Sequence, residues 1–271
     1  MNKIEQVKVE NTIIHGDSAD ILYTLPSKSV DLVVTSPPYS DLRKYGGVGD
    51  TWNENKFKDI AFGLWNALKD GGVIVWIVND KTEKGSKTLV SFKQALYFQE
   101  IGFNVNDVMI WQKDNPMPVV KQPRYQDVFE YMFIFSKGKP KTFNPIMIPC
   151  KCAGQAYNST TKNMGGENGR TYKEFNINKE KIKPNVWNCA VAKNNTIHPA
   201  VYPEKLVIDH ILSWSNENDV VLDPFVGSGT TAIACIKTNR KYIGIELNKD
   251  YVDLSRKRIA EYTSELIKEK N

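Results

Sequence analysis

Two short motifs in this sequence of 271 residues carry side chains suited to chemistry, and an apolar run precedes each of them. The first, called here the Ser36 motif, places a hydroxyl, two rigid prolines and an aromatic ring on one turn; it consists of Ser36, Pro37, Pro38 and Tyr39. The second, the Asp223 motif, predicts a glycine-rich turn that opens a helix; it consists of Asp223, Pro224, Phe225, Val226, Gly227, Ser228, Gly229, Thr230 and Thr231. Such a turn favours negative charge and lets a ligand approach the backbone. Together the motifs predict a flat, amine-bearing substrate beside a nucleotide-like cofactor.

Both motifs resemble those of the amino-group DNA methyltransferases, which transfer a methyl group from S-adenosylmethionine to an exocyclic nitrogen of a base. Their order resembles the beta group of that family, in which the catalytic motif comes first, a recognition segment follows and the cofactor motif comes last. The resemblance extends from about Thr12 to about Tyr262. It implies double-stranded DNA as the partner, leaves a cognate restriction endonuclease possible, and is compatible with a monomer or a homodimer.

The Ser36 motif suits attack by a nucleobase amine, whose lone pair is normally delocalised into the ring. The Ser36 hydroxyl oxygen and the Pro37 carbonyl oxygen can each accept a hydrogen bond from one of the two N–H groups of this amine. Such bonds favour the pyramidal nitrogen that attacks a methyl group. The prolines would fix these acceptors in advance, and Tyr39 offers a face for stacking. A paired base cannot reach such a pocket, so it must be flipped out. The alternative is a proline-ended strand with a surface tyrosine.

The choice of base depends on the first residue of this motif. Within the family, Asp-Pro-Pro-Tyr goes mostly with adenine N6, and Ser-Pro-Pro-Tyr often with cytosine N4. A neutral serine can accept an amine proton and donate to a neighbouring ring nitrogen, whereas an ionised aspartate would be repelled by the lone pair of cytosine N3. We predict cytosine N4, which the run 40–46 also favours by its similarity to cytosine-N4 members. Adenine N6 stays the alternative, because N1 of adenine is also an acceptor.

The resemblance also assigns a cofactor pocket. Glu246 would accept hydrogen bonds from two ribose hydroxyls, the Asp223 region would hold the methionine part, and Asp17 would lie on the adenine side. The segment around His198 would line the methionine side. The predicted cofactor-binding residues are Asp17, His198, Pro199, Asp223, Pro224, Phe225, Gly227, Ser228, Gly229, Thr230, Thr231, Glu246 and Asn248.

Other classes of protein share parts of this pattern. Residues 227–232 also fit the dinucleotide pattern G-x-G-x-x-A of NAD(P)-dependent oxidoreductases, but the Ser36 motif favours methyl transfer. Cys150 follows a proline, as in cytosine carbon-5 methylation, yet nothing indicates an activating base. Protein-glutamine and some RNA methyltransferases use a similar Asn-Pro-Pro-Tyr loop, normally after the cofactor motif. A non-catalytic DNA-binding module would need no intact cofactor pocket.

Charge indicates where DNA would bind. Residues 151–195 contain eight Lys or Arg and three acidic residues, which equals the whole net charge of +5. A local basic stretch is typical of a phosphate-binding surface, and a solvated loop is the alternative. The predicted DNA-contacting residues are Arg124, Arg170, Lys173, Lys181 and Lys183.

Alternating apolar strands and amphipathic helices predict a Rossmann-like, doubly wound α/β fold with a mixed seven-stranded sheet. The predicted strands are 12–14, 30–34, 73–78, 104–112, 129–136, 220–222 and 241–245, the fourth and fifth of them an antiparallel pair at a sheet edge. The resemblance places the cofactor strand beside the catalytic strand at the centre of the sheet, where carboxyl ends of strands bind ligands.

Periodicity fails between Cys150 and Asn195, and the segment is too long for an ordinary connection, which favours an irregular target-recognition insert. We therefore predict a catalytic half at residues 1–149, the insert at 150–195 and a cofactor-binding half at 196–271.

The composition, with 41% hydrophobic and 25% charged residues, is that of a soluble globular protein. The longest apolar stretch is too short for a bilayer and residues 1–5 lack a signal core, so we expect a cytoplasmic protein with no membrane partner. Four cysteines are too few and scattered for a disulfide framework, and Cys150, Cys152 and Cys189 form a poor zinc clip, so no metal is expected.

Overall fold

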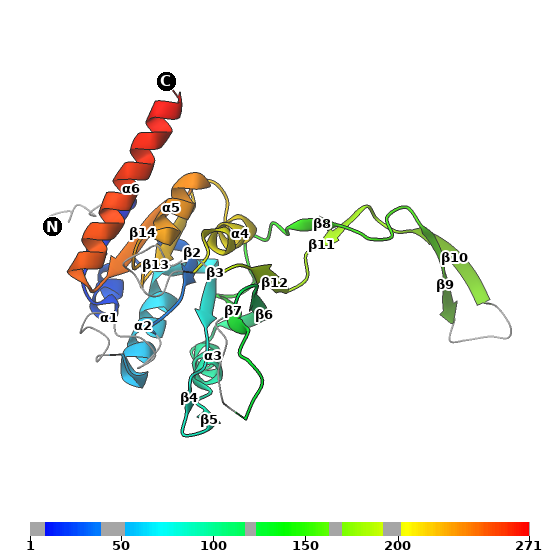
Figure 1. Ribbon diagram of the computed structural model, residues 1–271, viewed down its shortest axis with the longest axis horizontal. Helices are drawn as coiled ribbons and strands as arrows, with labels where there is room; N and C mark the ends of the chain where they lie inside the picture. The colour runs from blue at the N-terminus through cyan, green and yellow to red at the C-terminus, as the bar shows by residue number, and fades with distance from the viewer. Residues whose placement is uncertain (1–8, 39–51, 117–122, 163–169, 192–201, 271) are drawn as a thin grey trace. The chain divides into compact units, whose positions relative to one another are not determined.

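The structure is a computed structural model that describes residues 9–38, 52–116, 123–162, 170–191 and 202–270 (Figure 1). It divides into two compact units. The larger unit comprises Met1–Asn144 together with Asn185–Asn271, and the smaller comprises Pro145–Pro184. Within the described ranges, no helix combines the length and apolar character needed to cross a bilayer.

The larger unit is built on an eight-stranded mixed sheet with the order β1-β14-β13-β2-β3-β7-β6-β12. Its strands are β1 (Thr12–His15), β2 (Val30–Thr35), β3 (Leu68–Val78), β6 (Asn104–Lys113), β7 (Phe129–Ser136), β12 (Val186–Cys189), β13 (Val220–Asp223) and β14 (Lys241–Glu246). Strand β7 runs antiparallel to β3 and β6, and the other neighbours are parallel. The predicted α/β class, the seven predicted strands and the place of the cofactor strand beside the catalytic strand are confirmed.

The eighth strand, β12, was not predicted, and it moves the edge of the sheet outward by one strand. It pairs in parallel with β6, so the predicted antiparallel pair is not itself the edge. Trp187 in β12 is 5% exposed, and its ring stacks on that of His210 with 4.5 Å between centroids. Because only four residues form this strand, its identity depends on pairing and packing that no local pattern reveals.

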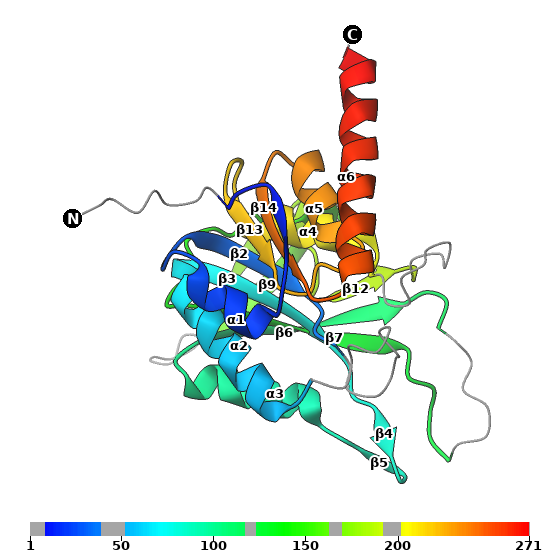
Figure 2. The same cartoon turned by 90° about the vertical axis from the view of Figure 1, so that its left-hand side faces the viewer.

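Helices cover both faces of the sheet, and Figure 2 shows α1, α2 and α3 on one side with α4, α5 and α6 on the other. Their bounds are α1 (Ser18–Ile21), η1 (Leu22–Thr24), α2 (Glu54–Ala67), α3 (Val90–Glu100), α4 (Glu204–Trp214), α5 (Thr230–Lys237) and α6 (Lys249–Lys270). Helix α2 shows how the core forms: Phe57, Ile60 and Leu64 recur on one face and are buried. It begins before this periodic face because Asn53 caps it, accepting a hydrogen bond from the N–H of Lys56 at 3.0 Å.

The smaller unit contains two antiparallel ladders. One joins β8 (Met147–Pro149) to β11 (Glu180–Ile182), and the other joins β9 (Ala156–Lys162) to β10 (Arg170–Asn176). Backbone pairing is therefore more extensive here than the polar sequence indicates. A short hairpin of the larger unit, β4 (Thr82–Glu83) with β5 (Ser86–Lys87), follows β3. The role of the smaller unit in target recognition stays a prediction.

Candidate active site

The two motifs meet at the carboxyl ends of the central strands, referred to below as this edge of the sheet, although they are far apart in the sequence. Strands β2 and β13 are parallel neighbours, with Val33 opposite Leu222, so their carboxyl ends lie at the same edge (Figure 2). Ser36 follows β2 directly, and Asp223 ends β13. The Thr35 hydroxyl donates to Oδ1 of Asp223 at 2.6 Å, across a separation of 188 residues. The fold thus places the predicted acceptor serine beside the predicted cofactor turn.

The carboxylate of Asp223 lies at the centre of a buried hydrogen-bond network. Oδ1 accepts the Thr35 hydroxyl and the Phe225 N–H, the latter at 3.0 Å. Oδ2 accepts the Thr231 hydroxyl at 2.5 Å and the Tyr202 hydroxyl at 2.7 Å. The last two hydroxyls also contact each other. A carboxylate has about four acceptor positions, and here four donors occupy them.

Titration in this network is governed by burial. Burial raises the pKa of Asp223, while the hydrogen bonds from Thr231, Thr35, Tyr202 and the Phe225 N–H oppose that rise by favouring the charged form. Burial also raises the pKa of Tyr202 well above its ordinary value, and the neighbouring Asp223 adds to the effect. The tyrosine therefore keeps its proton and acts as a donor.

Glu246 lies at the end of β14 and is half-buried at the same edge. Its Oε1 accepts the N–H of Asn248 at 2.8 Å, and its Oε2 accepts the N–H of Gly227 at 3.0 Å. Burial raises the pKa of Glu246, and these two N–H groups, together with that of Leu247, partly oppose the rise. A carboxylate has about four acceptor positions, so Glu246 can still accept a hydroxyl donor, which fits a ribose.

The predicted adenine-side residue lies next to Glu246. Strand β1 is parallel to β14, with His15 opposite Glu246, and Asp17 follows in the turn after β1. Oδ1 of Asp17 caps α1 through the N–H of Ala19 at 3.0 Å, and its Oδ2 forms an ion pair with Lys56 of α2. The neighbouring Ser18 hydroxyl donates to the carbonyl of Pro224. This turn is thereby fastened to the Asp223 motif.

Packing gives a second reason for glycine at position 229, beside the predicted close approach of a ligand. Its φ is +87°, and a Cβ at this position would lie 3.0 Å from Cβ of Ser255 in α6. The close neighbour is therefore another helix, so packing demands the glycine in addition to any ligand. Ser228 also has a partner on α6, since its hydroxyl accepts a hydrogen bond from the guanidinium of Arg258 at 2.9 Å.

Replacing Gly229 with valine should lower stability by about 1–3 kcal/mol, because it adds backbone strain and a collision with Ser255. Calorimetric unfolding without cofactor measures the effect. Gly85→Val is the matched control, because Gly85 has a φ of +83° with nothing within 4 Å of its Cβ position. If both variants lost the same stability, the contact between position 229 and Ser255 of α6 would contribute nothing to the loss.

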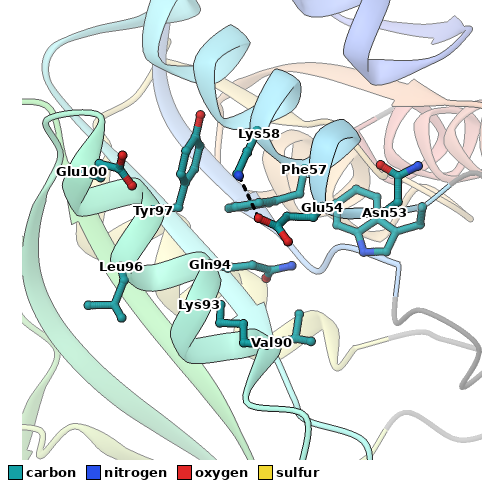
Figure 3. Close-up of a pocket in the computed structure, with 11 residues that line it drawn as sticks. Asn53, Glu54, Phe57, Lys58, Val90, Lys93, Gln94, Leu96, Tyr97 and Glu100 are labelled. Carbon is teal, nitrogen blue, oxygen red and sulfur yellow. Dashed lines mark ion pairs between the residues drawn. The ribbon is translucent and has the colours of Figure 1, made fainter.

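A separate cavity of about 380 Å³ lies between α2 and α3 (Figure 3). Trp52 lines it and also contacts Phe225 edge-on, with 5.3 Å between ring centroids. An ion pair between Glu54 and Lys58, 2.7 Å long, crosses its wall. The described residues that line this cavity include none of the predicted site residues.

The remaining predicted residues divide by where they lie. Ser36 and Pro38 are half-buried and Pro37 is buried, while Tyr39, His198 and Pro199 lie outside the described residues. Asn248 caps α6, accepting the N–H of Asp250 at 2.8 Å. Lys181 is exposed on β11 and Lys183 is half-buried just after it, whereas Arg124 belongs to the larger unit, 3.7 Å from Asp127. Arg170 and Lys173 lie on β10, with side chains outside the described set.

Three residues that were not among the predicted site residues belong to this edge of the sheet, although Thr35 and Tyr202 lie within or beside the segments that the sequence indicated. Thr35 and Tyr202 donate to Asp223, and Lys56 pairs with Asp17. Thr35 directly precedes the Ser36 motif, and Tyr202 follows the segment with His198 by a few residues. Their closeness to these segments in the sequence indicated that they lie near the site. It did not indicate their hydrogen bonds, because the acceptor, Asp223, lies elsewhere in the chain.

A doubly wound α/β domain whose glycine-rich turn meets a Ser-Pro-Pro-Tyr loop at one sheet edge has the architecture of a nucleotide-cofactor enzyme. Residues 30–257 match the model of the N6/N4 methyltransferase family, described as DNA methylase, and the chain belongs to that family. It is 45% identical over 247 residues to the orphan methyltransferase M.BamHII of Bacillus amyloliquefaciens, covering 86% of this chain and 90% of the relative. It is 31% identical over 260 residues to the type II methyltransferase M.HpaI of Haemophilus parainfluenzae, covering 93% and 74%.

Solved structures agree with this assignment. The M1.HpyAVI complex with S-adenosylmethionine matches with a TM-score of 0.60 and 26% identity, covering 92% of this chain and 98% of that one. The cytosine-N4-specific PvuII DNA methyltransferase matches in fold with a TM-score of 0.67 and 23% identity, covering 90% and 84%. The protein is a DNA methyltransferase that uses S-adenosylmethionine. The oxidoreductase, protein-glutamine and RNA alternatives are accordingly set aside.

Proposed function

We propose that the protein methylates the exocyclic N4 of cytosine in double-stranded DNA. The supporting observation is the side chain directly after β2: a neutral serine hydroxyl, rather than a carboxylate, stands beside the cofactor turn. The Ser36 oxygen accepts one amine N–H and the Pro37 carbonyl accepts the other. In the bound complex the Ser36 O–H would donate to N3 of the same cytosine.

The chain's own groups would orient the two reactants. S-adenosylmethionine, when bound, supplies a methyl group on a positively charged sulfur. Glu246 would hold the ribose through its remaining lone pairs, with Asp17 on the adenine side. The buried bonds to Asp223 fix the end of β2, so Ser36 is in place before the base arrives. The carboxylate acceptors at this edge therefore fit the ribose and adenine side of the family's cofactor.

Adenine N6 is the second candidate, and a specific relative favours it. The chain is 30% identical over 260 residues to the DNA adenine methyltransferase YhdJ of Escherichia coli K12, covering 92% of this chain and 82% of the relative. The name of the structurally similar PvuII enzyme specifies cytosine N4 instead. The chemistry of Ser36 decides our preference between the two.

The labelled nucleoside identifies the base. DNA from a host without methylation is incubated with the protein and S-adenosylmethionine carrying a labelled methyl group, then hydrolysed to nucleosides and separated. We expect the label in N4-methyldeoxycytidine. Label confined to N6-methyldeoxyadenosine would reject the cytosine proposal and leave the DNA methyltransferase assignment intact.

We also propose that the smaller unit recognises the target. Residues 145–184 contain seven basic and three acidic residues, and Lys181 is exposed there. Four of the five predicted DNA-contacting residues belong to this unit, and the fifth, Arg124, lies in the β6–β7 loop. A cognate endonuclease, the choice between monomer and homodimer, and a cytoplasmic location stay predictions.

Replacing Arg170, Lys173, Lys181 and Lys183 with alanine should weaken DNA binding. The slope of log affinity against log salt should fall by roughly 0.9 for each phosphate that the variant no longer neutralises, with S-adenosylmethionine affinity unchanged. Fluorescence anisotropy with a labelled duplex at several salt concentrations measures it. The matched control neutralises the exposed lysines of the larger unit Lys28, Lys249, Lys257 and Lys268. An equal slope change in that control would remove the smaller unit from the DNA interface.

A further inference from the structure

We infer that Thr35 is a positioning residue for methyl transfer, which holds the catalytic serine through the buried carboxylate of Asp223. Nothing in the sequence motifs or the family match assigns this role. The inference rests on the proposed function of Ser36 as the amine acceptor.

The geometry places Thr35 at the junction between sheet and catalytic loop. It is the last residue of β2, it is 0% exposed, and Ser36 follows it. In the backbone pairing of β2 with β13, Leu32 lies opposite Val221 and Val33 lies opposite Leu222. Just beyond these pairs, the 2.6 Å bond from Thr35 to Asp223 extends the connection by side chains. The bond from Thr35 to Asp223 thus fixes the residue that directly precedes Ser36 relative to the cofactor turn.

Asp223 is suited to join segments rather than to bind a ligand directly. Its side chain is enclosed, at 1% exposure, and the four donors described above occupy its acceptor positions. Thr35 comes from the end of the catalytic strand, Phe225 and Thr231 come from the cofactor turn and α5, and Tyr202 comes from the residues just before α4. One carboxylate therefore couples three parts of the chain that form the edge of the active site.

Losing one of these bonds should affect the rate more than cofactor binding. Removing the Thr35 hydroxyl breaks the side-chain connection between the end of β2 and β13. Thr35 still pairs with Trp76 of β3 through the backbone, and the donors from the cofactor turn continue to hold Asp223. A displacement of about 1 Å at a reacting group can cost about 100-fold in rate. We therefore expect the single-turnover rate of methyl transfer to fall about 10- to 100-fold, with S-adenosylmethionine affinity unchanged.

The test compares Thr35→Val, which keeps the shape but lacks the hydroxyl, with Thr35→Ser, which keeps the hydroxyl. Total methyl incorporation into DNA is measured in single turnovers, and cofactor affinity by calorimetry. We expect a large rate loss in the valine variant and recovery of most of the rate in the serine variant. Thr238→Val is the matched control, because the Thr238 hydroxyl donates within the end of α5, to the carbonyls of Ala234 and Cys235.

Equal rates in the valine and serine variants would overturn the inference, as would a proportional loss of cofactor affinity. If the valine variant does not fold, Thr35→Ala against Thr35→Ser makes the same comparison of one hydroxyl without placing a methyl against the carboxylate. A double-mutant cycle with Asp223→Asn adds a readout, since Thr35→Val should cost little more once Asp223 is changed. Additive effects would contradict coupling through Asp223. The assay counts methyl groups on any base. Methylation of adenine instead of cytosine would therefore leave the comparison of the Thr35 variants unaffected.

Discussion

Ser36→Ala should lose most of its turnover and keep its affinity for S-adenosylmethionine. In the proposed function the missing oxygen accepts a hydrogen bond from the amine of the target base, and that contact should be strongest as the nitrogen becomes pyramidal. Removing one preorganised group at a reacting atom typically lowers kcat about 100- to 1000-fold. Steady-state methyl transfer to DNA measures the rate, and calorimetry measures the cofactor affinity.

A matched control separates chemistry from folding. Ser27→Ala removes an exposed hydroxyl that donates to the carbonyl of Asn66 at 3.1 Å, shortly before β2 begins, and should leave turnover unchanged. Retained turnover in Ser36→Ala would remove this serine from the reaction. A parallel loss of cofactor affinity would instead place it in the cofactor pocket.

Glu246→Ala should weaken S-adenosylmethionine binding about 10- to 100-fold, because hydrogen bonds to a charged group contribute about 1.5–3 kcal/mol. Two causes add: the ribose loses its acceptors, and the N–H groups of Gly227 and Asn248 lose theirs. Glu246→Gln keeps one acceptor oxygen and should lie between alanine and the native protein. Calorimetry measures all three, with the exposed Glu261→Gln as control.

The affinity of the native protein should also depend on pH. Burial raises the pKa of Glu246, so its charge is lost at a higher pH than that of an exposed glutamate. As pH falls through that value, one acceptor becomes a donor and cofactor affinity should decrease. Glu246→Gln should lack this step. Native affinity in both Glu246 variants would place the ribose elsewhere.

The sequence by itself identified the chemistry and the class of fold. The Ser36 and Asp223 motifs are each contained within a few residues, so their hydroxyl, prolines, glycines and carboxylate are visible without any partner. The strands before them are mostly apolar because they are buried on both faces, with Asp31 as a buried charged exception. The order of the motifs and the α/β class followed from such local patterns, and the resemblance of the motifs to those of the amino-group DNA methyltransferases implied the cofactor.

Only the tertiary structure decided which side chains support the reacting groups. Thr35 and Tyr202 have ordinary sequence surroundings, and their roles arise from one carboxylate that is 188 positions from Thr35 and 21 from Tyr202. Gly229 is required by a serine on another helix, and β12 is a strand because β6 lies beside it. Hydrogen bonds and close packing of this kind depend on distances between remote segments, which composition and periodicity do not encode. A local motif therefore predicts what a residue can do, and the fold determines what holds it in place.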